Sequence, residues 1–145
     1  MATSTLINYL ETGSGLGTSN RRQIEEVKCS EAIAVGNFVS VDFSKPAQNI
    51  PLFVHKASSG ANRKCCVGVA LDAVTAAEAA AGKTIRIVVS GPVEAICLAH
   101  SADDPLAISG TAGSADTSAG ANAVVAYSVD GTTGLGTVFF LKQAY

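Results

Sequence analysis

The sequence has no tryptophan, one methionine and few charged side chains. The shortage of charge argues against one class of function, nucleic-acid binding. Only 15% of its 145 residues are charged, against about 25% in an average soluble domain. No dense basic run occurs, and Lys and Arg number 10 against 12 Asp and Glu, which argues against DNA or RNA as a ligand. A surface with few charges is poorly protected against association. We therefore expect a stable oligomer.

Long hydrophobic runs and paired cysteine motifs are also missing. No apolar stretch approaches the length of about 18 residues that a membrane span requires, and the first residues, MATSTLINYL, contain no basic side chain. We therefore expect a soluble chain without an export signal or a membrane partner, made in the cytoplasm of its host. Because no CxxC spacing occurs, the four cysteines are predicted to be reduced and mostly buried, namely Cys29, Cys65, Cys66 and Cys97.

What the sequence does contain is a series of short β-branched runs separated by turn residues, which is typical of a sandwich or barrel. Glycines near 35–37, 90–92 and 130–134 predict hairpins. A capping box at Thr75 and Glu78, with Gly82 after it, predicts one helix of about two turns. The predicted fold is all-β, a small antiparallel barrel or sandwich, with candidate strands at 24–29, 37–43, 51–56, 65–71, 84–90, 93–99, 105–109, 122–129 and 136–142.

Residues 1–23 differ from the rest, because they are rich in Thr, Ser, Gly and Asn and hold few apolar anchors. They are predicted to form an extended N-terminal arm, and residues 24–145 to form a single all-β domain. The basic pair Arg21-Arg22 ends the arm and is a candidate contact with an acidic partner surface. Residues 110–121 are predicted to form an exposed loop. No repeat period of about 20–50 residues is visible. The apolar residues of the arm are Leu6, Ile7, Tyr9, Leu10 and Leu16.

Candidate reactive motifs are all incomplete. The glycine-rich stretch TGSGLGT at 12–18 has Thr18 where a dinucleotide-binding loop needs its third glycine, and Gly82-Lys83-Thr84 lacks the upstream glycine of a phosphate loop. His100, Asp103 and Asp104 are interpreted as part of a loop between strands, and the isolated His55 as a surface or satisfied residue. Neither serine nor cysteine occurs in a nucleophile motif. The sequence therefore predicts no catalytic residue, no metal and no cofactor, and we expect no small-molecule substrate.

Residues 65–109 carry a pattern of strands and turns. The pattern consists of a GVALDA strand from Gly68, an Ala/Gly-rich turn at 76–82, a strand pair containing VVSGPVE, and a new strand at DPLAIS. This pattern, with AIAVGNFVSVD at 32–42 upstream, is similar to the small capsid decoration (cement) proteins of tailed bacteriophages. The resemblance covers about residues 30–142 and leaves the arm outside.

The resemblance implies a β-tulip-like or small-barrel domain that forms a homotrimer on the outer surface of the virion. Such proteins bind the major capsid protein where its subunits meet and stabilise the shell, and no enzyme activity is implied. On this hypothesis the arm, with Leu6, Ile7, Tyr9, Leu10, Leu16, Arg21 and Arg22, contacts the capsid.

The hydrophobic final strand is a candidate for either core packing or subunit contact. Its residues are Val138, Phe139, Phe140 and Leu141. Two alternative functions stay open at this point. One is a phage head fibre or a glycan- or receptor-binding module, although aromatic side chains are scarce. The other is a small enzyme, which would need His55 or His100 in a deep pocket.

Overall fold

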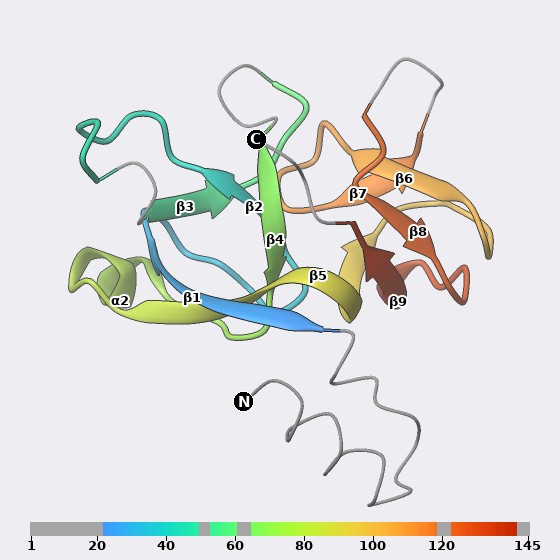
Figure 1. The fold of residues 1–145 in the computed structure, drawn as a ribbon, viewed down its shortest axis with the longest axis horizontal. Helices are drawn as coiled ribbons and strands as arrows, with labels where there is room; N and C mark the ends of the chain where they lie inside the picture. Colours follow the sequence, from blue (N-terminus) through green and yellow to red (C-terminus); the bar gives the residue numbers. More distant parts are fainter. Residues whose placement is uncertain (1–21, 50–52, 61–64, 119–122, 142–145) are drawn as a thin grey trace, which may run out of the picture.

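The computed structural model describes residues 22–49, 53–60, 65–118 and 123–141. These residues are almost entirely strands and connecting loops (Figure 1). No helix among them is long and apolar enough to cross a membrane. The elements are β1 (Gln23–Cys29), β2 (Phe38–Val41), β3 (Phe53–Lys56), β4 (Cys66–Ala70), α2 (Ala76–Ala80), β5 (Thr84–Cys97), β6 (Pro105–Ile108), β7 (Ala115–Thr117), β8 (Ala126–Ser128) and β9 (Gly134–Phe140).

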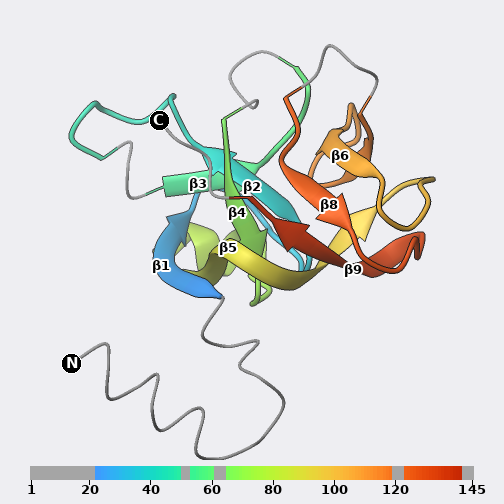
Figure 2. The same ribbon diagram turned by 45° about the vertical axis from the view of Figure 1, so that its right-hand side comes forward.

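The strands close into two five-stranded rings that share β5. In the first ring the order is β1-β3-β2-β4-β5, and β5 pairs back with β1. In the second ring the order is β5-β7-β6-β8-β9, and β9 pairs back with β5. The two rings lie side by side, with the first half of β5 in one and the second half in the other (Figures 1 and 2). Closure gives every strand of each ring a partner on both sides over at least part of its length.

The prediction of an all-β fold with one short helix is confirmed, although the sheet is mixed. Two of its pairings, β1 with β3 and β5 with β7, are parallel. The helix has the predicted capping box, since the Thr75 side chain accepts from the Glu78 N–H and the Glu78 carboxylate accepts from the Thr75 N–H. Gly82 follows it with a φ of 82°, a conformation that favours glycine after a helix end.

Only one of the three predicted hairpins forms. The segment at 130–134 joins β8 to its antiparallel partner β9, as predicted. The predicted turn at Ser90-Gly91-Pro92 is wrong, because β5 runs through it without a break. Gly91, with a φ of 105°, bends the strand there, and its pairing changes from Gln23↔Ser90 with β1 to Gly91↔Phe140 with β9. The third segment, at 35–37, is a tight turn before β2 and does not join two paired strands.

The predicted loop at 110–121 is also partly wrong. Residues 115–117 form β7, and Ser114 and Ala115 are buried. Small side chains allow this burial, because the segment passes close to the backbone of the first ring: the Gly113 N–H donates to the Ala57 oxygen, and the Phe38 N–H donates to the Gly113 oxygen. Small side chains at 113–115 therefore allow close packing, while residues 110–112 are exposed as predicted.

The two rings repeat one another in connectivity and in register. Each begins with a strand that pairs in parallel with its third strand, and the pairing Cys29↔Val54 in the first ring matches Cys97↔Ala115 in the second. The same register continues around both rings, so that Ile87 corresponds to Val138. At corresponding positions the side chains point in the same direction, into or out of the ring. No repeat is visible in the sequence, because few of these positions share an amino acid.

The polar contacts that follow β4 and β8 repeat as well. The Asp72 carboxylate accepts from the Arg86 backbone N–H at 3.0 Å. At the corresponding place in the second ring, the Asp130 carboxylate accepts from the Thr137 backbone N–H, also at 3.0 Å. Hydrogen bonds from the Arg86 side chain, and then from its backbone N–H, lower the pKa of Asp72 to about 2. Backbone hydrogen bonds from Thr137 and then Thr132 lower the pKa of Asp130 to about 2. Each carboxylate therefore fixes the end of the loop that leads into the closing strand.

Each ring has its own hydrophobic core, and the second core extends to the outside of the first ring. The interior of the first ring includes Val39, Val54, Ile85 and Ile87. The cluster inside the second ring includes residues from the outer face of the first ring, among them Phe38, whose ring centroid is 6.3 Å from that of Phe140. The two rings are thus joined by a shared strand and by shared apolar packing.

Candidate functional site

The outer face of β8, β9 and the second half of β5 is apolar and exposed. Tyr127, Phe139 and Pro92 form one row across it, because Tyr127↔Phe139 and Pro92↔Phe139 are direct cross-strand partners. Tyr127 is 45% exposed and Phe139 is 39% exposed. Cross-strand neighbours on one face are in contact distance, so the row is continuous.

A second row extends this surface along the same strands. Leu135 pairs with Ile96, and Leu135 is 49% exposed. The turn before β2 packs beside it: the Ile96 N–H donates to the Gly36 oxygen at 2.8 Å, and a Cβ on Gly36 would lie 2.4 Å from Leu135 Cδ1. We call this surface the outer β8–β9 face and define it by Pro92, Ile96, Tyr127, Val129, Leu135 and Phe139.

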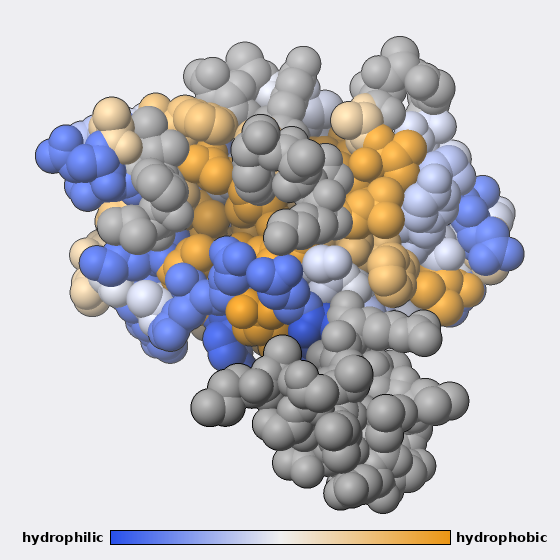
Figure 3. All heavy atoms as spheres, viewed as in Figure 1, coloured by the Kyte–Doolittle hydropathy of each residue, from blue (hydrophilic) through white to orange (hydrophobic). Residues whose placement is uncertain are grey.

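The outer β8–β9 face differs from the surface over β1. Hydrophobic residues reach the surface on the β8 and β9 side of the molecule, whereas the surface over β1 is mostly hydrophilic (Figure 3). Sequence reasoning did not identify Tyr127, Val129 or Leu135. The signal was present in β9, where Val138, Phe139 and Phe140 are consecutive, because a strand that is apolar on both sides is covered on both sides.

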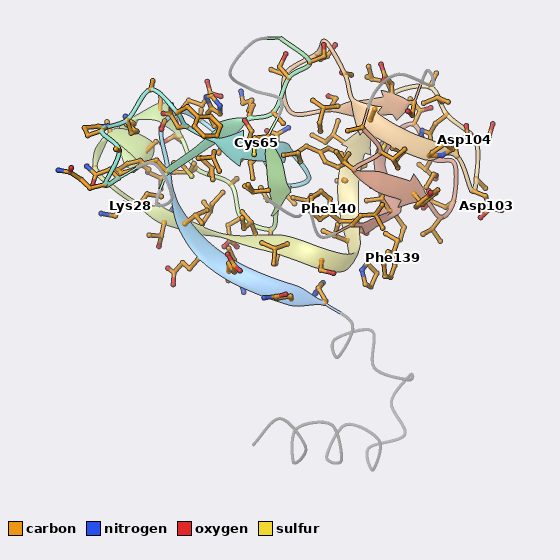
Figure 4. All side chains as sticks on the ribbon, turned by 45° about the horizontal axis from the view of Figure 1, so that its top comes forward. Lys28, Cys65, Asp103, Asp104, Phe139 and Phe140 are labelled. Carbon is orange, nitrogen blue, oxygen red and sulfur yellow. The ribbon has the colours of Figure 1, made fainter. Side chains whose placement is uncertain are left out.

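The predicted contact segment 138–141 is divided between the interior and this face. Val138 and Phe140 are fully buried in the core of the second ring, while Phe139 points outward (Figure 4). Leu141 is half-buried, and its N–H donates to the Val125 oxygen. Core packing therefore accounts for two of these residues, and Phe139 is the one with an aromatic side chain free to contact another molecule.

The predicted arm lies mostly outside the described residues, and this includes Leu6, Ile7, Tyr9, Leu10, Leu16 and Arg21. Arg22 is the first residue described, and it is exposed. Since β1 begins at Gln23, which pairs with Ser90, the arm joins the domain beside the bend in β5. That junction is adjacent to Pro92 on the outer β8–β9 face.

The acidic loop near His100 connects β5 to β6, as predicted. His100 Nδ1 lies 2.6 Å from the Leu98 oxygen, and the Asp104 carboxylate accepts from the Ser101 N–H at 2.7 Å. Asp103 and Asp104 lie at the outer end of the second ring (Figure 4). Among the described residues, no group of three or more His, Cys, Asp or Glu is placed to hold a metal ion.

The interpretation of His55 as a surface or satisfied residue is wrong. It is 8% exposed, and within the described part of the chain its Nε2 has no hydrogen-bond partner. Ser40 lies opposite it on β2, fully buried, and its hydroxyl also has no partner there. No hydrogen bond joins these two side chains.

Asp42 near His55 is a buried carboxylate held by hydrogen bonds. Burial raises its pKa, but hydrogen bonds from Ser30 and Ser44 outweigh burial and, with the charge of His55, lower the pKa to about 2. The Ser44 N–H and hydroxyl donate to Asp42 at 3.0 and 2.6 Å. This arrangement stabilises the loop after β2, since a buried charge with several donors is satisfied.

The thiols are not activated. Cys29, Cys66 and Cys97 are buried, as predicted, and Cys65 is half-buried. Burial raises the pKa of Cys66 to about 12 and that of Cys29 and Cys97 to about 11. Nucleophilic cysteines need a lowered pKa, so these thiols act as small hydrophobic side chains.

The fold is that of a small all-β domain made of two fused rings, and it occurs in a known phage protein. No family model and no curated protein matches the chain. Among solved structures, the chain is similar to the head fiber gp8.5 N base of bacteriophage phi29, with a TM-score of 0.54 and 13% identity. The match covers 86% of this chain and 98% of the other. At this identity the likeness shows the fold alone.

Proposed function

We propose that this chain is a structural protein of a tailed-phage head, and that it binds the outer surface of the shell as a decoration protein. The observation that carries the proposal is the fold likeness to a head fibre base over 98% of that domain. The resemblance of residues 65–109 to decoration proteins supports the same class independently. On this proposal the partners are the major capsid protein and further copies of the chain in a trimer.

The surface of the protein supports a binding role. Its apolar side chains gather on the outer β8–β9 face, where Tyr127, Leu135 and Phe139 are each more than a third exposed. Contiguous exposed apolar surface marks interaction sites on stable proteins. The three buried thiols, by contrast, are protonated at neutral pH.

The stabilisation of a shell by such a protein follows from linkage. A protein that binds only the assembled lattice stabilises that state by its binding free energy, about 2.7 kcal/mol per site at 100 times Kd. In a trimer three arms bind together, so effective concentration multiplies modest individual contacts. Ordering of each arm costs entropy, which burial of Leu6, Ile7, Tyr9 and Leu10 offsets.

Removal of residues 1–22 tests this mechanism. The truncation ends directly before Gln23, so that every strand from β1 to β9 is retained. We expect the truncated protein to stay folded by circular dichroism and to keep the number of chains in its oligomer, and to lose co-sedimentation with undecorated heads. A double variant, Arg21→Ala with Arg22→Ala, is the finer control and should weaken binding in a salt-dependent way. Unchanged binding by the truncated protein would contradict the role of the arm.

A head fibre base is the second candidate, favoured by the likeness to the phi29 head fiber base. Electron microscopy of heads saturated with the full-length native protein separates the two. A decoration protein gives compact density at repeated lattice positions, whereas a fibre base carries a projecting fibre.

A further inference from the structure

Part of the outer face of the first ring, where β4 pairs with β5, is buried inside the protein. Val69 and Val88, which are cross-strand partners on β4 and β5, are both 0% exposed. They belong to the same hydrophobic cluster as Phe140 and Val138 of the second ring, and Leu71 packs against that cluster. This face of the first ring therefore closes one side of the second ring's core.

The second ring has a corresponding pair of residues, and within the described chain this part of the outer β8–β9 face is exposed. By register, Tyr127 occupies the position of Val69 and Phe139 that of Val88, since both pairs are direct partners in equivalent ladders. Tyr127 and Phe139 are nonetheless 45% and 39% exposed, and Val129 beside them is 52% exposed. The repeat thus leaves one copy of an apolar docking face without its counterpart.

We propose that the outer β8–β9 face binds a second copy of this chain. Within one chain, the corresponding part of the first ring's outer face, at Val69 and Val88, is already covered by a five-stranded ring of this same protein. A second copy of the chain contains two more rings of the same fold. This inference rests on the self-association included in the proposed function, and it names the surface that carries it.

One charged residue lies on this face and bears on the symmetry of the contact. Glu94 is exposed between the two apolar rows, and its cross-strand partner is Thr137. At the corresponding place in the first ring, Glu26 lies opposite Arg86. A two-fold pairing of this face with itself would place the Glu94 carboxylates of both copies in one contact, which is unfavourable for like charges. We therefore propose a head-to-tail contact, which forms a closed ring such as a trimer where the rotation between subunits closes.

Phe139→Asp tests the proposal, with Phe43→Asp as the matched control. Phe43 is 51% exposed and lies after β2, outside the outer β8–β9 face. Light scattering after size exclusion should give the native chain a mass near three times the 14.6 kDa of one chain. The Phe139→Asp variant should elute as a single chain, and the Phe43→Asp variant should keep the native mass.

Two results would overturn the proposal: a native protein that is monomeric, or a Phe139→Asp variant that keeps the native mass. If Phe139→Asp fails to fold, as judged by circular dichroism, the mass of the Tyr127→Asp variant is measured instead, and retention of the native mass overturns the proposal. Co-sedimentation with heads is measured in parallel, so the two hypotheses fail separately. A native oligomer that ignores heads rejects the decoration role and keeps the interface. If the native protein is a monomer and Phe139→Asp abolishes its binding to heads, the face binds the shell, and the proposed contact with a second copy is rejected.

Discussion

Phe139 and Phe140 are adjacent residues of one type on opposite sides of β9, so alanine at each position separates folding from association. Phe140 is fully buried, and its ring contacts that of Phe38. Removal of a buried phenylalanine costs about 3–5 kcal/mol, which lowers Tm by about 6–20 °C in a domain of this size. Phe139 faces solvent in part, so we expect Phe139→Ala to cost the single chain about 1 kcal/mol.

Urea unfolding followed by circular dichroism measures both free energies, at a protein concentration low enough to keep the chains separate. The midpoint should fall strongly for Phe140→Ala and slightly for Phe139→Ala. Light scattering at higher concentration should show the reverse order, with association weakened more by Phe139→Ala. Equal loss of stability in the two variants would refute the placement of these side chains, and with it the register of β8 and β9.

Further predictions concern charge, backbone and thiols. The pKa of Asp42 is about 2 in the folded protein, and its ordinary value is 3.8. The ionised carboxylate therefore stabilises the folded state by about 2 kcal/mol above pH 4, and this contribution is lost as the pH falls to 2. Urea unfolding of Asp42→Asn should lack this pH dependence. Gly68→Ala should destabilise by about 1–3 kcal/mol, as thermal unfolding would show, because its Cβ would lie 2.7 Å from the Val88 oxygen. Thr75→Ala should cost about 1 kcal/mol by loss of the cap, again measured by unfolding. Mass spectrometry without reductant should find four free thiols, and a thiol reagent at neutral pH should reach Cys65 before the buried three.

The sequence predicted the elements that local chemistry controls. Alternation of apolar and polar residues at 37–43 and 84–90 corresponds to β2 and the first half of β5, because side chains of a half-buried strand alternate between two environments. The helix at Ala76–Ala80 was predicted from Thr75, Glu78 and Gly82, since capping depends on residues close in sequence. Burial of the cysteines followed from their small apolar side chains.

The sequence could not predict the features that depend on distant pairing. Gly91 is compatible with a turn or with a bent strand, and pairing with β1 on one side and β9 on the other makes it a bend. Residues 115–117 look like loop by composition and become β7 because they pair with β6. Burial of His55 likewise depends on neighbours from other strands and not on its own segment.

The sequence by itself determined that this protein is all-β and poor in charge, because composition, alternation and turn residues act locally. Only the tertiary structure decided that the strands close into two matching rings on a shared β5. It also decided that Val69 and Val88 are covered while Tyr127 and Phe139 are exposed. Ring closure joins residues far apart in the chain, and the identity of the covered face depends on how one ring packs against the other.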